Sequence, residues 1–177
     1  MTVRAALWMV PWTLLACSGA LRSAHAADAC DGFSWDVHQE RAVFATTAQA
    51  LPAGRALAAA PVLVPKQLYQ LTLSPQDQVS FAVTPGKRML ADGAYAGVAH
   101  VHIAQPGSYR VALDGGFWID LVSGNTLITS SDFTGQPHCD APRKIVLFSM
   151  PAGDLVLQLS GATSTQVRVA IVPAPTH

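Results

Sequence analysis

The chain is poor in charge, and this scarcity already excludes several classes of protein. Only 12% of its 177 residues are charged, and the 11 basic residues are balanced by 11 acidic ones. A protein that follows nucleic acid needs a clear excess of Lys and Arg, so we expect no nucleic-acid partner. Half of the residues are hydrophobic, which argues against intrinsic disorder and favours one globular domain.

Motifs of the common enzyme classes are also missing. Glutamate occurs once, as Glu40, so a pair of catalytic carboxylates would have to be aspartates. The sequence contains no GxSxG, no GxGxxG or Walker loop, and no DxDxDG calcium loop. It therefore indicates neither nucleophilic hydrolysis nor nucleotide binding. Whether the protein is an enzyme stays open at this point, with the balance against it.

No hydrophobic run is long enough to span a membrane, but a shorter one lies near the N-terminus. Arg4 precedes an apolar run over residues 5–16, whereas a bilayer span needs roughly 20 residues. Ala24-His25-Ala26 then supplies the small residues of a cleavage site, so we predict a signal peptide over residues 1–26 and a periplasmic or secreted protein. The alternative is lipoprotein processing at Cys17, whose preceding residues match that signal less well.

Removal of the signal peptide leaves two cysteines, Cys30 and Cys139. Two cysteines in an exported protein most simply pair, so we predict a disulfide between them. Because the bridge closes a long loop, the chain-entropy model assigns it on the order of 4–5 kcal/mol. The alternative, two thiolate ligands for a metal, has no CxxC spacing to support it.

The rest of the chain predicts one helix followed by many strands. Residues 27–65 contain a helix beginning near Val37, capped by Ser34 or Asp36, and then an extended connector rich in Ala and Pro. Residues 66–177 show roughly eight or nine short alternating segments separated by turns. These segments are 68–73, 79–83, 96–103, 109–113, 117–122, 126–129, 145–148, 155–159 and 167–171. We expect an all-β, antiparallel, jelly-roll-like sandwich with one N-terminal helix.

Two sets of residues resemble known families. Residues 99–113 and 144–160 each read as strand, Pro-Gly turn and strand. This pattern resembles the pre-peptidase C-terminal jelly rolls of secreted bacterial proteins, which implies a non-catalytic accessory or binding domain. Residues 30–37 (CDGFSWDV), Trp118-Ile119-Asp120, and Cys139 with Arg143-Lys144 are similar to a family of small exported proteobacterial proteins. Some members of that family are labelled as homogentisate-dioxygenase-like.

His100-Val101-His102 is the candidate metal site. Residues i and i+2 of a strand share a face, so both imidazoles could reach one ion. The pair is similar to the His-x-His of cupins such as homogentisate 1,2-dioxygenase, which hold a metal with a further carboxylate and a later His. Here no Glu follows His102, and Asp154-Leu155-Val156 stands after Gly153 where the later His is expected, so His138 or Asp120 would have to complete a site. The alternatives are a polar strand face, a weak divalent metal site and a redox-active metal.

The candidate ligand-binding residues are Trp118, Asp120, Asp132 and His138. Trp118 and Asp120 fall on one strand face, and an aromatic face offers a large contact area. Asp132 and His138 lie in the long polar segment 130–140, a typical place for function on a rigid sandwich. Core packing of Trp118 and a simple crossing between sheets are the alternatives. We therefore expect a non-enzymatic exported protein that binds a small molecule, a glycan or another exported protein, with a cupin-like dioxygenase centred on His100 and His102 as the alternative.

Overall fold

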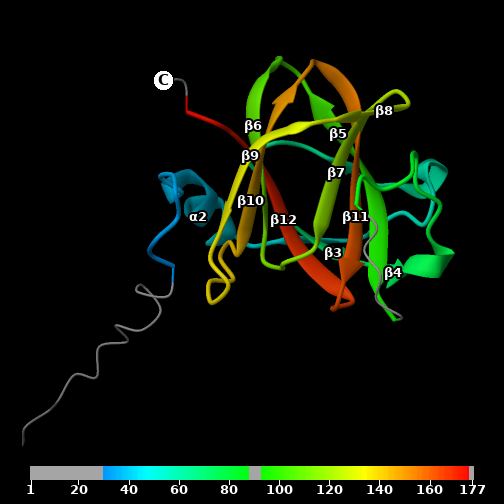
Figure 1. Ribbon diagram of the computed structural model, residues 1–177, viewed down its shortest axis with the longest axis horizontal. Coiled ribbons are helices and arrows are strands. Elements are labelled where there is room, and N and C mark those ends of the chain that lie inside the picture. The colour runs from blue at the N-terminus through cyan, green and yellow to red at the C-terminus, as the bar shows by residue number, and fades with distance from the viewer. Residues whose placement is uncertain (1–29, 88–92, 176–177) are drawn as a thin grey trace, which may run out of the picture.

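The protein is an all-β sandwich, as the sequence predicts. The computed structural model describes residues 30–87 and 93–175. Strands account for 50% of the described residues and helices for 9%, and two sheets stack face to face around one core (Figure 1). The predicted signal peptide, including Cys17, lies outside the described residues.

Each sheet has six strands, and strands that are neighbours in the orders below are hydrogen-bonded to each other. Sheet A has, in spatial order, β1 (Gln49–Pro52), β3 (Leu68–Thr72), β12 (Gln166–Pro173), β6 (Gly107–Leu113), β10 (Lys144–Met150) and β9 (Ser130–Gly135). Sheet B has β2 (Val62–Leu63), β5 (Tyr95–Ile103), β11 (Gly153–Ala162), β7 (Trp118–Ser123) and β8 (Thr126–Ile128), with β4 (Ser74–Pro75) paired to β5.

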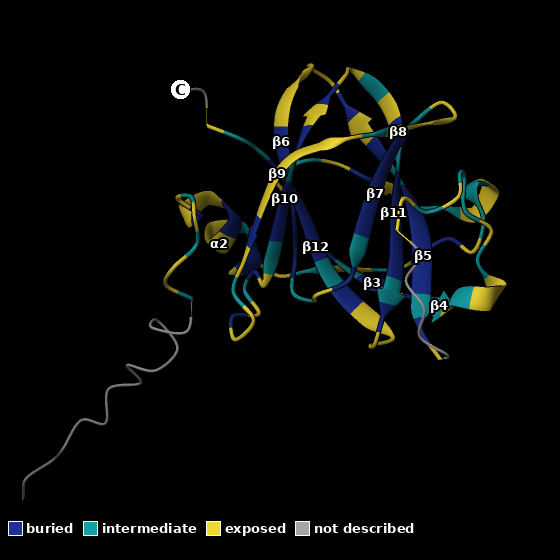
Figure 2. Cartoon of the chain, viewed as in Figure 1, coloured by how far each residue is buried: buried dark blue, intermediate teal, exposed yellow. Residues whose placement is uncertain are grey.

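The core lies between the sheets because alternate residues of each strand point inward. Val101 and Ile103 of β5 and Leu157 of β11 are buried from sheet B, and Val111 and Ile171 are buried from sheet A. Figure 2 shows the buried residues running along the central strands, whereas the edge strand β9 is mostly exposed. The apolar core is therefore concentrated on the central strands of both sheets.

Two short strands from the predicted N-terminal region, residues 27–65, extend the sheets. β1 pairs in parallel with β3, and β2 pairs in parallel with β5. The expectation of a purely antiparallel sandwich therefore needs correction, since both sheets are mixed. The connector also contains a short 3-10 turn, η1 (Leu57–Ala59).

The N-terminal helix α2 (His38–Phe44) is shorter than its apolar spacing indicates. The Asp36 Oδ1 atom accepts a hydrogen bond from the His38 backbone N–H at 2.9 Å, so Asp36 satisfies a free N–H group at the helix start. Val37 and Phe44 are buried in a second apolar cluster with Ala112 and Ala170, which alternate with the core residues of sheet A. The helix therefore covers the outer face of that sheet (Figure 1).

Residues 79–83 do not form the strand that their alternation predicts. The short 3-10 turn η2 (Gln76–Gln78) is followed by irregular backbone up to Lys87. The Val83 N–H group donates to Gln158 Oε1 at 3.1 Å, and the Gln158 side-chain amide donates to the Val83 carbonyl at 3.2 Å. A buried side chain of β11 thus replaces a strand partner for this segment, because Gln158 belongs to the outward-facing set of sheet B.

The predicted disulfide is confirmed. Cys30 and Cys139 are bonded with a Cα–Cα distance of 4.9 Å, which joins the start of the described chain to the loop before β10. In residues 30–87 and 93–175, no helix has both the length and the apolar character needed to cross a bilayer.

Candidate functional site

A cavity of about 390 Å³, here called the Trp118 cavity, opens at one lateral edge of the sandwich between β7, β9 and β10. Phe133 of β9 pairs with Val146 of β10, and Val146 is part of the core. β8 has only three residues, so sheet B does not extend over Phe133, whose side chain is 70% exposed. Because sheet B ends at the short strand β8, the part of sheet A that carries Phe133 is left uncovered, and this leaves the cavity.

The wall of the Trp118 cavity is mostly apolar, and its polar side chains are Ser130 and two lysines. Phe117, Ile119, Phe133 and Val146 contribute apolar side chains, and Lys87 and Lys144 contribute ammonium groups. A volume of this size accommodates a small organic ligand.

Trp118 is held in one orientation by Asp120. The indole Nε1–H donates to Asp120 Oδ1 at 2.8 Å, and the backbone N–H of Gly86 donates to Asp120 Oδ2 at 3.0 Å. A Cβ atom at position 86 would lie 2.9 Å from Asp120 Oδ1, so glycine permits this close approach. Asp120 is only 6% exposed. It therefore positions Trp118 and the segment before residue 88, and it does not face the cavity.

Two of the three lysines in the chain approach the same indole ring. The Nζ atoms of Lys87 and Lys144 each lie 5.5 Å from the centre of the Trp118 ring. Both positions lie within the distance range of a cation–π interaction. Among the described residues neither ammonium forms an ion pair with a carboxylate. The Trp118 cavity therefore carries positive charge that the described part of the chain does not neutralise.

Lys144 is the more enclosed of the two lysines. Its Nζ donates to the Phe117 carbonyl oxygen at 2.8 Å. Burial lowers the pKa of the Lys144 ammonium, and the positive charge of Lys87 lowers it further. Attraction by the Trp118 ring favours the charged form, but desolvation and repulsion prevail. Lys144 thus loses its proton more readily than an ordinary lysine.

The structure brings only part of the predicted ligand site together. Trp118 lines the cavity with Phe133, a residue of the predicted functional segment 130–140. Asp132 is exposed, and its Oδ1 accepts a hydrogen bond from the neighbouring Phe133 N–H at 2.8 Å. His138 is exposed in the loop beside Cys139. Neither Asp132 nor His138 lines the Trp118 cavity.

His100 and His102 lie on the outer face of sheet B, because their neighbours Val101 and Ile103 point into the core. The His100 Nε2 atom is 3.1 Å from the Leu57 carbonyl oxygen. The His102 Nδ1 atom is 2.7 Å from Asp154 Oδ1, and both side chains are exposed. The two imidazoles therefore have separate partners. In the part of the chain that the structure describes, no three His, Cys, Asp or Glu side chains gather closely enough to hold a metal ion.

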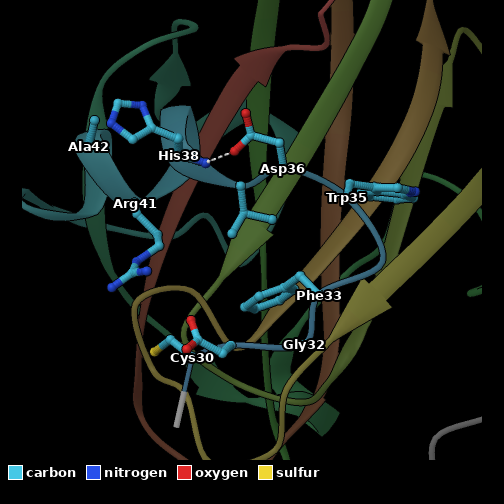
Figure 3. A pocket seen from close by; sticks show the side chains of 10 residues that line it. Cys30, Gly32, Phe33, Trp35, Asp36, His38, Arg41 and Ala42 are labelled. Carbon is cyan, nitrogen blue, oxygen red and sulfur yellow. Dashed lines mark hydrogen bonds between the residues drawn. The ribbon is translucent and has the colours of Figure 1, made fainter. Parts of the chain in front are cut away.

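A larger cavity, of about 510 Å³, lies beside the N-terminal segment and α2. Figure 3 shows Asp36 and His38 linked at the helix start, with Trp35, Phe33 and Arg41 around them. Acidic and basic side chains are mixed here, and Asp36 is already hydrogen-bonded. This region has no unbalanced charge comparable to that of the Trp118 cavity.

The sequence reasoning missed Lys87, Phe133 and Lys144 as site residues. Phe133 and Val146 can be placed on one face only once β9 and β10 are paired, and Lys87 follows a segment that forms no strand. One feature of the sequence could have indicated Lys144. Lys144 stands two residues before Val146, so strand alternation puts its side chain on the inward face at the end of a buried strand.

Comparisons with known proteins identify no family for this chain. No model of a known protein family matches it, and a search of curated proteins found no significant match.

Proposed function

We propose that the protein binds small carboxylate-bearing ligands with an apolar or ring-shaped body, and that it does so in the Trp118 cavity after export from the cytoplasm. The observation that carries this proposal is the pair Lys87 and Lys144, which flank one oriented indole in an apolar cavity without a carboxylate partner among the described residues.

The two parts of such a ligand would have different contacts. The carboxylate lies between the two ammonium groups, where it relieves their mutual repulsion and forms charge-assisted hydrogen bonds. The apolar body packs against Phe133 and Val146 and covers part of the exposed Phe133 ring. Burial of that ring supplies a hydrophobic contribution that a simple inorganic anion lacks. Aromatic acids and uronic-acid ends of glycans share this chemistry.

Export is supported by the cysteines. A disulfide between Cys30 and Cys139 is stable in an oxidising compartment and is rare in the cytosol. The apolar run over residues 5–16 and the cleavage pattern at 24–26 point the same way. We infer a periplasmic or secreted protein, processed after Ala26.

The cupin-like dioxygenase stays a second hypothesis, favoured only by the His102–Asp154 contact at 2.7 Å. A non-haem iron site requires two His and a carboxylate around one ion, and His100 is directed to the Leu57 carbonyl instead. Elemental analysis of the untagged protein tests this hypothesis. Stoichiometric iron that is lost in a His100→Ala/His102→Ala variant, with oxygen uptake on an aromatic diol, would favour the enzyme over the binding protein.

The binding proposal is tested by calorimetric titration with three probes. Benzoate has both a ring and a charge, benzyl alcohol has only the ring, and acetate has only the charge. We expect benzoate to bind most tightly and its affinity to fall with added salt. Lys87→Gln should weaken benzoate binding about tenfold, which corresponds to roughly 1.4 kcal/mol, whereas the matched control Lys66→Gln should not. Equal binding of all three probes, or equal loss in both variants, would contradict the proposal.

A further inference from the structure

The Trp118 cavity holds an amine that is placed for covalent chemistry. The Lys144 Nζ atom lines the cavity and is anchored by its hydrogen bond to the Phe117 carbonyl. A neutral amine retains two N–H groups, so it can keep this hydrogen bond while its lone pair remains available. The anchor therefore orients the nitrogen without consuming its nucleophilicity.

The surroundings of Lys144 make its neutral amine form more accessible than that of an ordinary lysine. The side chain is half-buried among Phe117, Trp118 and Val146, and the only charge that faces it from the described residues lining the cavity is that of Lys87. Both effects lower the pKa of Lys144. A desolvated lysine beside another cation is a recognised way to activate an amine.

Lys87 has a different role. It is exposed at the mouth of the Trp118 cavity, and its ammonium lies at the same distance from the indole centre as that of Lys144. A carboxylate bound to Lys87 would hold the rest of a small ligand near Lys144. One lysine thus captures the anion, and the other is within the same cavity.

We propose that Lys144 forms a reversible imine with aldehyde or ketone ligands that also carry a carboxylate, so that the Trp118 cavity captures carbonyl acids covalently. This inference rests on the proposed function and refines it, because with a carbonyl acid Lys87 alone holds the carboxylate while Lys144 reacts as the neutral amine.

The reaction needs no further reagent. The Lys144 nitrogen attacks the carbonyl carbon, and a proton moves from nitrogen to oxygen to give a carbinolamine. Loss of the hydroxyl group with a second nitrogen proton releases one water molecule and forms the C=N bond. No electrons are gained or lost overall, and addition of water reverses the step.

The experiment uses 4-formylbenzoate as the probe and sodium cyanoborohydride to trap the imine, followed by peptide mapping. The chain offers a clean readout because Lys66, Lys87 and Lys144 are its only lysines. We expect Lys144 to be modified at least tenfold faster than Lys66 near neutral pH. The preference should shrink as the pH rises, because an ordinary lysine then also loses its proton.

Variants separate the roles of the residues. Lys144→Arg keeps a positive charge and a hydrogen-bond donor but cannot form an imine, so it should abolish the fast adduct, whereas Lys66→Arg should leave it unchanged. Lys87→Gln should slow modification several-fold without moving it to another lysine. The uncharged aldehyde 4-formylbenzamide should react less selectively. A Trp118 indole N–H resonance that is retained in Lys144→Arg verifies that the cavity is still folded.

Modification that is equal at all three lysines, or that is fastest at Lys66 or Lys87, would overturn the inference. Tight binding of benzoate without an adduct at Lys144 would refute imine formation and leave the proposed function standing. A selective adduct at Lys144 without benzoate binding would uphold the reactive amine and contradict the proposed function.

Discussion

In the part of the chain that the structure describes, two tryptophans have cations above their rings, and their surroundings differ in charge balance. At Trp35 the Arg110 guanidinium lies 4.9 Å from the ring centre, and Arg110 also forms a buried ion pair with Glu40 at 3.1 Å. At Trp118 the two cations are lysines that form no ion pair within the described chain. The first cluster is neutralised and closed, whereas the second is positive and open.

This difference indicates what each cluster is for. Under α2, Arg110 also donates to the Asp36 carbonyl at 2.8 Å, so it joins the helix to the outer face of sheet A. Such an arrangement fixes structure. Two like charges at one indole repel each other, and within the described chain only the Trp118 ring and the Phe117 carbonyl offset this repulsion. Conflicts of this kind are typical of functional sites.

Loss of the disulfide that links the N-terminal segment to the sandwich should have the largest effect on the free energy of unfolding. Replacement of both Cys30 and Cys139 by Ser releases a loop of 109 residues and should lower the free energy of unfolding by about 4–5 kcal/mol. Urea denaturation of the oxidised protein and the variant measures the difference. A loss below about 1 kcal/mol would mean that α2 and the Trp35 cluster hold this segment without the bridge.

Removal of the negative charge from the closed cluster should have the next largest effect. Glu40→Gln leaves the Arg110 charge buried and unpaired, so we expect a loss of about 3 kcal/mol. The matched change in the open cluster, Lys87→Gln, should alter the free energy of unfolding by no more than about 0.5 kcal/mol. Comparable losses in the two variants would remove the distinction between the clusters.

Two phenylalanines extend the comparison between the closed cluster at Trp35 and the open cluster at Trp118. Phe44 of α2 is 4% exposed and Phe133 of β9 is 70% exposed. Phe44→Ala should cost about 3 kcal/mol of stability, and Phe133→Ala should cost almost none. Phe133→Ala should instead weaken benzoate binding about fivefold, through loss of the apolar wall. Calorimetric titration of both variants checks this, and unchanged affinity in Phe133→Ala would place the ligand elsewhere.

The smallest expected effect is on the pH dependence of the free energy of unfolding. The pKa of Lys144 is lowered in the folded protein by burial and by Lys87, so between that pKa and the ordinary lysine value of about 10.4 the unfolded chain binds more protons than the folded one. The contribution of Lys144 to stability therefore becomes more favourable as the pH rises through this interval. In Lys144→Arg the side chain stays protonated, so the rise should be absent when unfolding is followed by urea titration across the interval.

The sequence predicts the frame of the molecule better than its edges. Alternation in residues 107–113, 144–150 and 166–173 reflects one buried face, which is a local property, and these segments are strands. Alternation in residues 79–83 has the same form, but this segment crosses a sheet and pairs with the Gln158 side chain. Local patterning cannot distinguish a strand from a segment whose polar groups find a partner far along the chain.

Only part of the candidate site could be predicted from the sequence, again because strand alternation is a local property. Trp118 and Asp120 are two residues apart on one strand, so their shared face follows from the pleat. Lys87, Phe133 and Lys144 come from separate segments, and they meet because β8 is short and leaves the β9–β10 edge uncovered. That depends on how far each strand extends, which the alternation of residues does not specify.

The most direct test of the Trp118 cavity as the binding site is an NMR titration of the protein without residues 1–26, which removes Trp8 and Trp12. The titration follows the indole N–H resonances of Trp35 and Trp118 as benzoate is added. The resonances are assigned with Trp35→Phe and Trp118→Phe variants. If the open, positive cluster is the binding site, the Trp118 signal shifts in a saturable manner, the Trp35 signal stays in place, and Lys87→Gln reduces the response. A Trp118 signal that does not move at benzoate concentrations that saturate binding, or a larger shift at Trp35, would contradict the assignment.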